Sequence, residues 1–250
     1  MNLEPWQIAL AFLGALLVGV SKTGVAGLGI LFVVMFANVI PAKQSSGFVL
    51  PLLIFGDVVA VWAYRKHAKW AHVWRLLPWT AAGVVLGYFA MGRIDDRQAK
   101  VLIGGIIIAM VAAHVWRRAR AKSAELAEYG MWVAPMVGVL AGFTTLVANA
   151  AGPLMAIYLL AMRLPKMEYV GTAAVFFLLL NCFKVPFMVN LGLITTGSFG
   201  FNLMLAPVVF LGAVLGRWLL PKINQRLFEN LALGLSAVAG IRLLFSTWHA

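Results

Sequence analysis

The sequence predicts an all-α polytopic membrane protein made of two inverted-topology repeats, each a broken-helix hairpin followed by three transmembrane helices. Three observations predict this class. Of the 250 residues, 63% are hydrophobic and only 11% are charged, whereas a soluble domain carries about 25% charged residues. The hydrophobic residues fall into runs long enough to cross a bilayer. The polar and glycine positions of the second half of the chain also match those of the first half.

Eight apolar runs account for the predicted membrane segments. Six have the length of one membrane helix, about 20 residues, and cover 46–64, 73–91, 98–116, 168–190, 199–220 and 228–246. The runs 6–36 and 132–162 are longer, and a helix of about 31 residues would measure about 46 Å against a hydrocarbon core of about 30 Å. Both contain a polar break near the middle, GVSKTGVAGLG and GFTTLVANAAGP. We interpret each long run as a hairpin of two short helices, with one kinked helix as the alternative.

The repeat divides the chain into a first membrane repeat at 1–116, a cytoplasmic linker at 117–130 and a second, inverted membrane repeat at 131–250. The aligned pairs include Gly19–Gly142, Ser21–Thr144, Lys22–Thr145, Asp57–Asn181, Gly83–Gly212 and Gly87–Gly216. Duplication of this kind is typical of transporter folds.

Charge predicts the orientation of the repeats. The loop 65–75 and the linker 117–130 are rich in Lys and Arg, whereas 190–202, the counterpart of 65–75, carries no charge. Cytoplasmic loops are enriched in Lys and Arg, so we expect 65–75 inside and 190–202 outside. Equivalent loops then lie on opposite faces, which makes the repeats inverted and places both termini in the periplasm. The start, MNLEPW, lacks the basic residues of a signal peptide, and we expect residue 1 in the mature protein.

Composition argues against several other classes. One cysteine, Cys182, allows no internal disulfide, and the four histidines are scattered, so no metal or cofactor is expected. The net charge of +12 is explained by cytoplasmic loops that face anionic lipid headgroups, so we expect no nucleic-acid partner. A membrane enzyme would need a nucleophile that faces a base. Ser21 and Lys22 are adjacent and cannot face one another on a helix, so we expect no enzyme.

The two polar breaks predict an anion-binding site. The second short helix of each hairpin begins just after the break, and a helix N-terminus offers free N–H donors and a partial positive charge. In inverted repeats the two breaks meet near the centre of the protein. The predicted substrate-binding residues are Ser21, Lys22, Thr23, Gly24, Thr144, Thr145, Asn149, Asn181 and Lys184. The alternative roles are helix packing for the small residues and bonding to the preceding turn for the hydroxyls.

Three ionisable residues, Lys22, Asp57 and Lys184, lie deep inside predicted membrane runs. Such a charge costs several kcal/mol unless it finds a partner or water, which makes each residue a site candidate. Their charges sum to +1, or to +2 when Asp57 is protonated, and both values favour an anion over a cation. We predict that Asp57 is the coupling residue, which takes up and releases a proton. A structural ion pair with Lys22 or Lys184 is the alternative.

The stretches GVSKTGVAGLG, GFTTLVANAAGPLMAIYLL and NCFKVPF resemble the sulfite exporter TauE/SafE-type permeases, and the resemblance covers essentially the whole chain. It implies a secondary transporter of the bacterial inner membrane whose substrate is a small sulfur-containing anion, such as sulfite, sulfoacetate or a similar sulfonate. We expect alternating access, export and coupling to protons. A passive anion channel and a carrier of a small carboxylate are the alternatives. The sequence leaves open the particular anion, the coupling ion, the direction and the oligomeric state.

Overall fold

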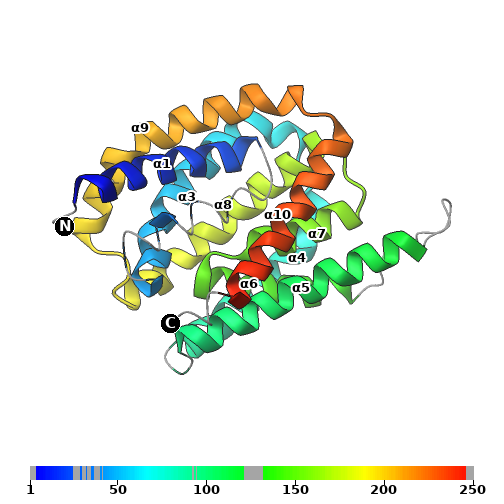
Figure 1. Cartoon of the computed structure of the whole chain (residues 1–250), viewed down its shortest axis with the longest axis horizontal. Helices are drawn as coiled ribbons and strands as arrows, with labels where there is room; N and C mark the ends of the chain where they lie inside the picture. The colour runs from blue at the N-terminus through cyan, green and yellow to red at the C-terminus, as the bar shows by residue number, and fades with distance from the viewer. Residues whose placement is uncertain are drawn as a thin grey trace.

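The computed structural model describes residues 4–24, 29, 32, 35–36, 40, 42–91, 93, 95–120 and 132–245. These residues form a bundle of α-helices with two short 3₁₀ turns and no strand (Figure 1). The elements are α1 (Pro5–Thr23), α3 (Ala42–Tyr64), η1 (Arg65–His67), α4 (Trp70–Ala90), α5 (Asp96–Arg120), α6 (Val133–Ala148), α7 (Ala151–Ala161), α8 (Lys166–Asn190), α9 (Thr196–Leu219), η2 (Leu220–Lys222) and α10 (Gln225–Phe245). The predicted all-α class is confirmed.

Each of the six predicted single spans coincides with one helix, and the ends agree to within about four residues, the usual uncertainty of a predicted boundary. Within the described residues, four segments are long and apolar enough to cross a membrane: Pro5–Thr23, Gln44–His67, Lys166–Asn190 and Thr196–Lys222. The assignment of α4, α5 and α10 as spans stays a prediction. Most of the predicted linker, from residue 121 onward, lies outside the described residues.

Both long apolar runs are interrupted at their predicted breaks. In the first run α1 ends at Thr23, and the N–H of Gly24 bonds to the Val20 carbonyl. In the second run α6 ends at Ala148 and α7 begins at Ala151. Asn149 between them has φ 51°, a left-handed conformation that Asn tolerates better than most residues. Residues 25–36 fall mostly outside the described part, so the second arm of the first hairpin stays a prediction.

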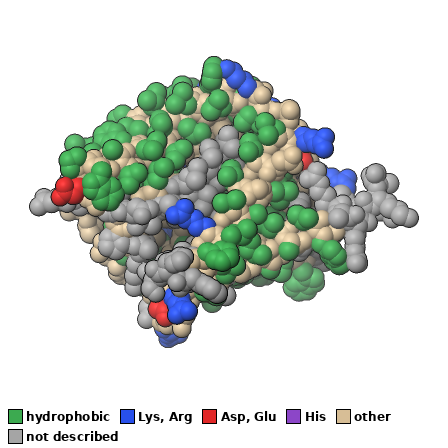
Figure 2. Space-filling model, in the orientation of Figure 1, with side chains coloured by type: hydrophobic (Ala, Val, Ile, Leu, Met, Phe, Trp, Pro, Cys, Tyr) green, Lys and Arg blue, Asp and Glu red, His purple; other side chains and the backbone are tan. Residues whose placement is uncertain are grey.

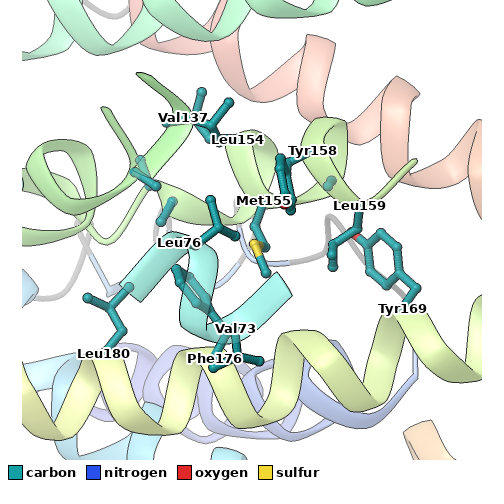
Figure 3. Close-up of a cluster of buried hydrophobic side chains, with 14 of the residues drawn as sticks. Val73, Leu76, Val137, Leu154, Met155, Tyr158, Leu159, Tyr169, Phe176 and Leu180 are labelled. Carbon is teal, nitrogen blue, oxygen red and sulfur yellow. The ribbon is translucent and has the colours of Figure 1, made fainter. Parts of the chain in front are cut away.

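Contacts with α4 show how the chain turns between α6 and α7. In chain order the contacts pair Gly138 with Leu76, Leu146 with Gly87, and Tyr158 with His72. α6 therefore runs parallel to α4, and the far end of α7 lies beside the start of α4. The chain thus returns toward the end of α4 at which α6 begins. Figure 3 shows side chains of α4, α6, α7 and α8 that meet in the core around this hairpin.

Two helix pairs, α1 with α9 and α4 with α6, are in close backbone contact. A side chain at Gly19 would overlap the α9 backbone at Val209, and one at Gly142 would overlap the α4 backbone at Thr80. Small residues permit such approaches in membrane bundles. Gly19 and Gly142 are aligned in the repeat, so the two helix contacts occupy equivalent positions. A chain made of two repeats is expected to contain such a pair of equivalent contacts. The inversion of the halves across a membrane stays a prediction.

The loops gather at two opposite ends of the bundle. At one end, Lys69 forms an ion pair of 3.0 Å with Glu168, and Lys166 donates to backbone carbonyls of η2 and the following residue. At the other end of α3, Gly47 packs against Leu193. The loops at 65–69 and 191–195 therefore lie at opposite ends. We call the first the basic end, defined by Arg65, Lys66, Lys69, Arg163, Lys166 and Lys222.

The outer surface of the bundle is strongly apolar. Figure 2 shows hydrophobic side chains over much of α9 and α1, at the upper left. The exposed side chains of α9 include Phe199, Leu203, Met204, Phe210, Leu211 and Trp218. Apolar surface on this scale exceeds what a soluble monomer exposes and fits contact with lipid chains.

The N-terminus of α9 is held by a capping box. Thr195 Oγ1 accepts from Ser198 N at 3.1 Å, and Ser198 Oγ accepts from Thr195 N at 2.9 Å. We expect Thr195→Ala to lower the free energy of unfolding by about 1 kcal/mol, since one helical N–H loses its acceptor. Thermal unfolding in detergent measures the loss. Thr195→Ser keeps the oxygen and should behave as the wild type, and equal losses in both variants would contradict the cap.

Candidate functional site

The breaks of both long runs line one cavity of about 120 Å³. Its polar lining consists of Ser21, Lys22 and Gly24 at the end of α1, Thr145 and Asn149 at the end of α6, Asp57 of α3 and Asn181 of α8. A polar cavity of this size has room for several water molecules or one small oxyanion. Seven residues predicted from sequence as substrate-binding or coupling thus share one space.

A cluster of three polar side chains crosses the cavity wall from α1 to α8. The Lys22 ammonium nitrogen is 2.8 Å from Asp57 Oδ1, an ion pair, and Asn181 Nδ2 donates to Asp57 Oδ2 at 2.6 Å. The same ammonium lies 4.6 Å from the centre of the Phe177 ring, within cation–π range. The Asp57 side chain is fully buried, whereas that of Lys22 is 12% exposed. Lys22 is therefore the cation that a molecule in the cavity can reach.

Lys184 lies behind the cavity wall and does not line it. Its side chain is fully buried, and its ammonium donates to Thr145 Oγ1 at 3.1 Å and to Asn149 Oδ1 at 2.7 Å. Asn149 Nδ2 in turn donates to the Ser46 carbonyl at 2.8 Å, which fixes the amide on both sides. Lys184, predicted as a substrate-binding residue, thus contacts two residues of the lining rather than the cavity.

The site carries one positive charge that no carboxylate neutralises among the described residues. Asp57 is paired with Lys22, and the hydrogen-bond partners of Lys184 are both neutral. In the sequence, the runs 6–36, 46–64 and 132–162 contain no further charged residue. The run 168–190 adds only Glu168, which pairs with Lys69 at the basic end. With both lysines protonated and Asp57 ionised, the three charges sum to +1. A buried ammonium is costly in a low-dielectric interior, so this excess charge favours a bound anion.

Three predicted hydroxyls are used by the backbone instead. Thr23 Oγ1 donates to the Ala213 carbonyl of α9 at 2.7 Å, and Thr144 Oγ1 bonds within α6 at 3.3 Å. Both side chains are buried, and neither lines the cavity. Ser21 lines the cavity, but its hydroxyl donates to the Val18 carbonyl at 2.8 Å. The contacts of these three hydroxyls are the ones expected for the alternative to substrate binding, namely helix packing and hydrogen bonding to the preceding turn.

Sequence reasoning missed the apolar wall of the cavity. On α8 it consists of Tyr169, Val170, Ala173, Ala174 and Phe177. Their spacing from Asn181 places them on the same helix face, because residues three or four apart are neighbours. That periodicity was the available signal. The start of α7 also faces the cavity through Gly152 and Pro153, and so presents a helix N-terminus to it.

The described residues contain no group of three or more His, Cys, Asp or Glu side chains that could hold a metal ion. The polar groups of the cavity are ammonium, amide and hydroxyl groups with a single carboxylate, a donor-rich set. Such a set binds and orients an anion.

An apolar helix bundle with a broken helix beside a buried cationic cavity defines a polytopic membrane transport protein. Residues 11–243 match the family model described as "Sulfite exporter TauE/SafE". The chain therefore belongs to the sulfite exporter TauE/SafE family, and the resemblance seen in the sequence motifs is confirmed.

One curated relative is the "Probable inner membrane transporter protein TsaS" of Comamonas testosteroni. It is 26% identical over 186 residues, which cover 74% of this chain and 76% of the relative. No solved structure gives a significant match. The family and the relative together confirm a membrane transporter rather than an enzyme.

Proposed function

We propose that this protein is a secondary transporter that exports a small sulfur-containing anion, such as sulfite, sulfoacetate or a similar sulfonate, by alternating access. The observation that carries the proposal is that two lysines and one carboxylate gather at the cavity, with Lys184 behind Thr145 and Asn149. The family description names sulfite export, and the relative is named an inner membrane transporter.

The cavity supplies three kinds of donor to an anion's oxygens. Lys22 offers a partly exposed ammonium, Thr145 offers a hydroxyl hydrogen, and the start of α7 offers backbone N–H groups. The apolar wall from Tyr169 to Phe177 excludes water from the remaining side, which strengthens each polar contact. The site thus replaces the hydration shell of an oxyanion with fixed donors.

The basic end orients the protein in the membrane. Lys and Arg concentrate in cytoplasmic loops, so the basic end faces the cytoplasm under this proposal. The start of α1 and the end of α10 then face the periplasm. Alternating access moves the hairpins relative to the helices that they pack on, with Pro51 of α3 and Pro186 of α8 as bending points.

Two measurements on one preparation test the function. Purified protein in detergent is heated with sulfite, sulfate, sulfoacetate, taurine or acetate, and a bound anion raises the unfolding temperature. Counterflow in liposomes, with the membrane potential clamped to zero, then measures whether unlabelled anion trapped inside accelerates uptake of labelled anion outside, which a carrier does and a channel does not. We expect sulfur oxyanions, but not acetate, to give both effects. No response to any of the sulfur oxyanions would contradict the proposal.

A further inference from the structure

The three buried charges of the site occupy different positions relative to the cavity. Lys22 and Asp57 both line it and pair with one another at 2.8 Å, so they neutralise each other at the wall. Lys184 is fully buried behind that wall and bonds only to neutral side chains among the described residues. The net charge of the site is therefore supplied by a residue that a substrate in the cavity does not contact.

Thr145 connects Lys184 with the cavity. Its hydroxyl oxygen accepts a hydrogen bond from the Lys184 ammonium at 3.1 Å, so its own hydrogen points elsewhere. Among the described residues no acceptor takes that hydrogen, and Thr145 lines the cavity. A hydroxyl that accepts from an ammonium is polarised and becomes a stronger donor. Thr145 thus presents the charge of Lys184 to the cavity as a directed hydrogen-bond donor.

We infer that Lys184 sets the charge of the transported anion, so that the site takes a monoanion while Asp57 is ionised and a dianion only when Asp57 carries a proton. The inference rests on the proposed function and specifies its substrate. A monoanion makes the loaded site neutral. A dianion makes the loaded site neutral only if the Asp57 carboxylate takes up one proton from solution. That proton is then transported together with the dianion. Proton coupling therefore depends on the charge of the substrate.

The surroundings of Asp57 support this role. On the α1 side, Asp57 faces Lys22. On the α8 side, it faces Asn181, and Cys182 and Lys184 lie nearby on the same helix. The α6 segment beside it contains no charged residue, and the one charge of α9, Arg217, lies over Trp62 near the basic end. Protonation of Asp57 removes the negative charge that opposes Lys22, so the charge of its ammonium then balances the second charge of a dianion.

The test compares two anions whose charge stays constant from acidic to mildly alkaline buffer, methanesulfonate with one negative charge and sulfate with two. Counterflow of each is measured in liposomes as a function of pH. The wild type should prefer methanesulfonate by at least about tenfold near neutral pH, a difference typical of one charged hydrogen bond. Sulfate transport should rise as the pH falls, whereas methanesulfonate transport should not. Equal preference or parallel pH profiles would overturn the inference.

Matched variants change the charge of the site by one unit each. Asp57→Asn raises it to +2 and should make sulfate transport independent of pH. Lys184→Met lowers it to zero and should reduce methanesulfonate transport by at least about tenfold. The double variant returns to +1 and should recover the preference for methanesulfonate, which a merely structural role of either residue would not produce. Size-exclusion chromatography of each variant in detergent verifies folding.

The outcomes separate this inference from the proposed function. If the wild type transports sulfur oxyanions but the double variant is no better than Lys184→Met, the charge count is wrong and the transporter assignment stands. If Lys184→Met alone matches the wild type, Lys184 does not supply the charge. If pH dependence persists in Asp57→Asn, the titrating group is a different one. If the wild type transports no sulfur oxyanion, the proposed function itself fails.

Discussion

Replacement of Lys22 by methionine is expected to reduce anion transport by about a hundredfold or more. The variant removes the one cation that the described cavity lining exposes, and it lowers the net charge of the site from +1 to zero. Hydrogen bonds to charged groups contribute about 1.5–3 kcal/mol each, and the lost net charge adds to that. Counterflow of labelled sulfite in liposomes measures the effect.

The same variant leaves Asp57 buried beside Asn181 without its cation. Removal of one partner of a buried ion pair lowers the free energy of unfolding by about 3–5 kcal/mol. A double variant, Lys22→Met with Asp57→Asn, separates the two effects. It should regain most of the thermal stability in detergent, whereas transport stays low because the cavity still lacks a reachable ammonium. Wild-type transport by the single variant would show that the substrate does not contact Lys22.

Replacement of Gly142 by leucine is expected to prevent correct packing of α6 on α4. A Cβ at this position would overlap the Thr80 carbonyl of α4, and a backbone group cannot turn aside as a side chain can. Overpacking of a well-packed contact costs typically about 1–3 kcal/mol, and we expect a value at or above the upper limit here. The loss shows as a reduced yield of monodisperse protein and a lower unfolding temperature in detergent.

Gly105 of α5 provides the matched control. It also lies inside a helix, but a Cβ there would meet no neighbouring atom of the described residues within 4 Å. Gly105→Leu should therefore fold as the wild type does. Similar losses in both variants would mean that helix propensity or membrane insertion, and not the approach of α6 to α4, accounts for the effect.

The secondary structure could be predicted closely because its causes are local. A membrane helix must satisfy its own backbone groups, so apolar run length alone places the helix ends within a few residues. The breaks after Thr23 and Ala148 could be predicted for the same reason, since each run exceeds the thickness of a bilayer. The three ionisable residues deep inside the runs, Lys22, Asp57 and Lys184, could also be identified from the sequence alone.

Which polar residues face the cavity could not be predicted, because it depends on the rotation of each helix about its axis. The glycine contacts of α1 with α9 and of α6 with α4 set that rotation. They turn Thr23 toward α9 and leave Thr145 on the cavity wall, whereas Lys184 is placed behind that wall by the packing of α8. Run lengths are properties of short segments, whereas the direction of a side chain results from packing between segments that are far apart in the chain, such as α1 and α9.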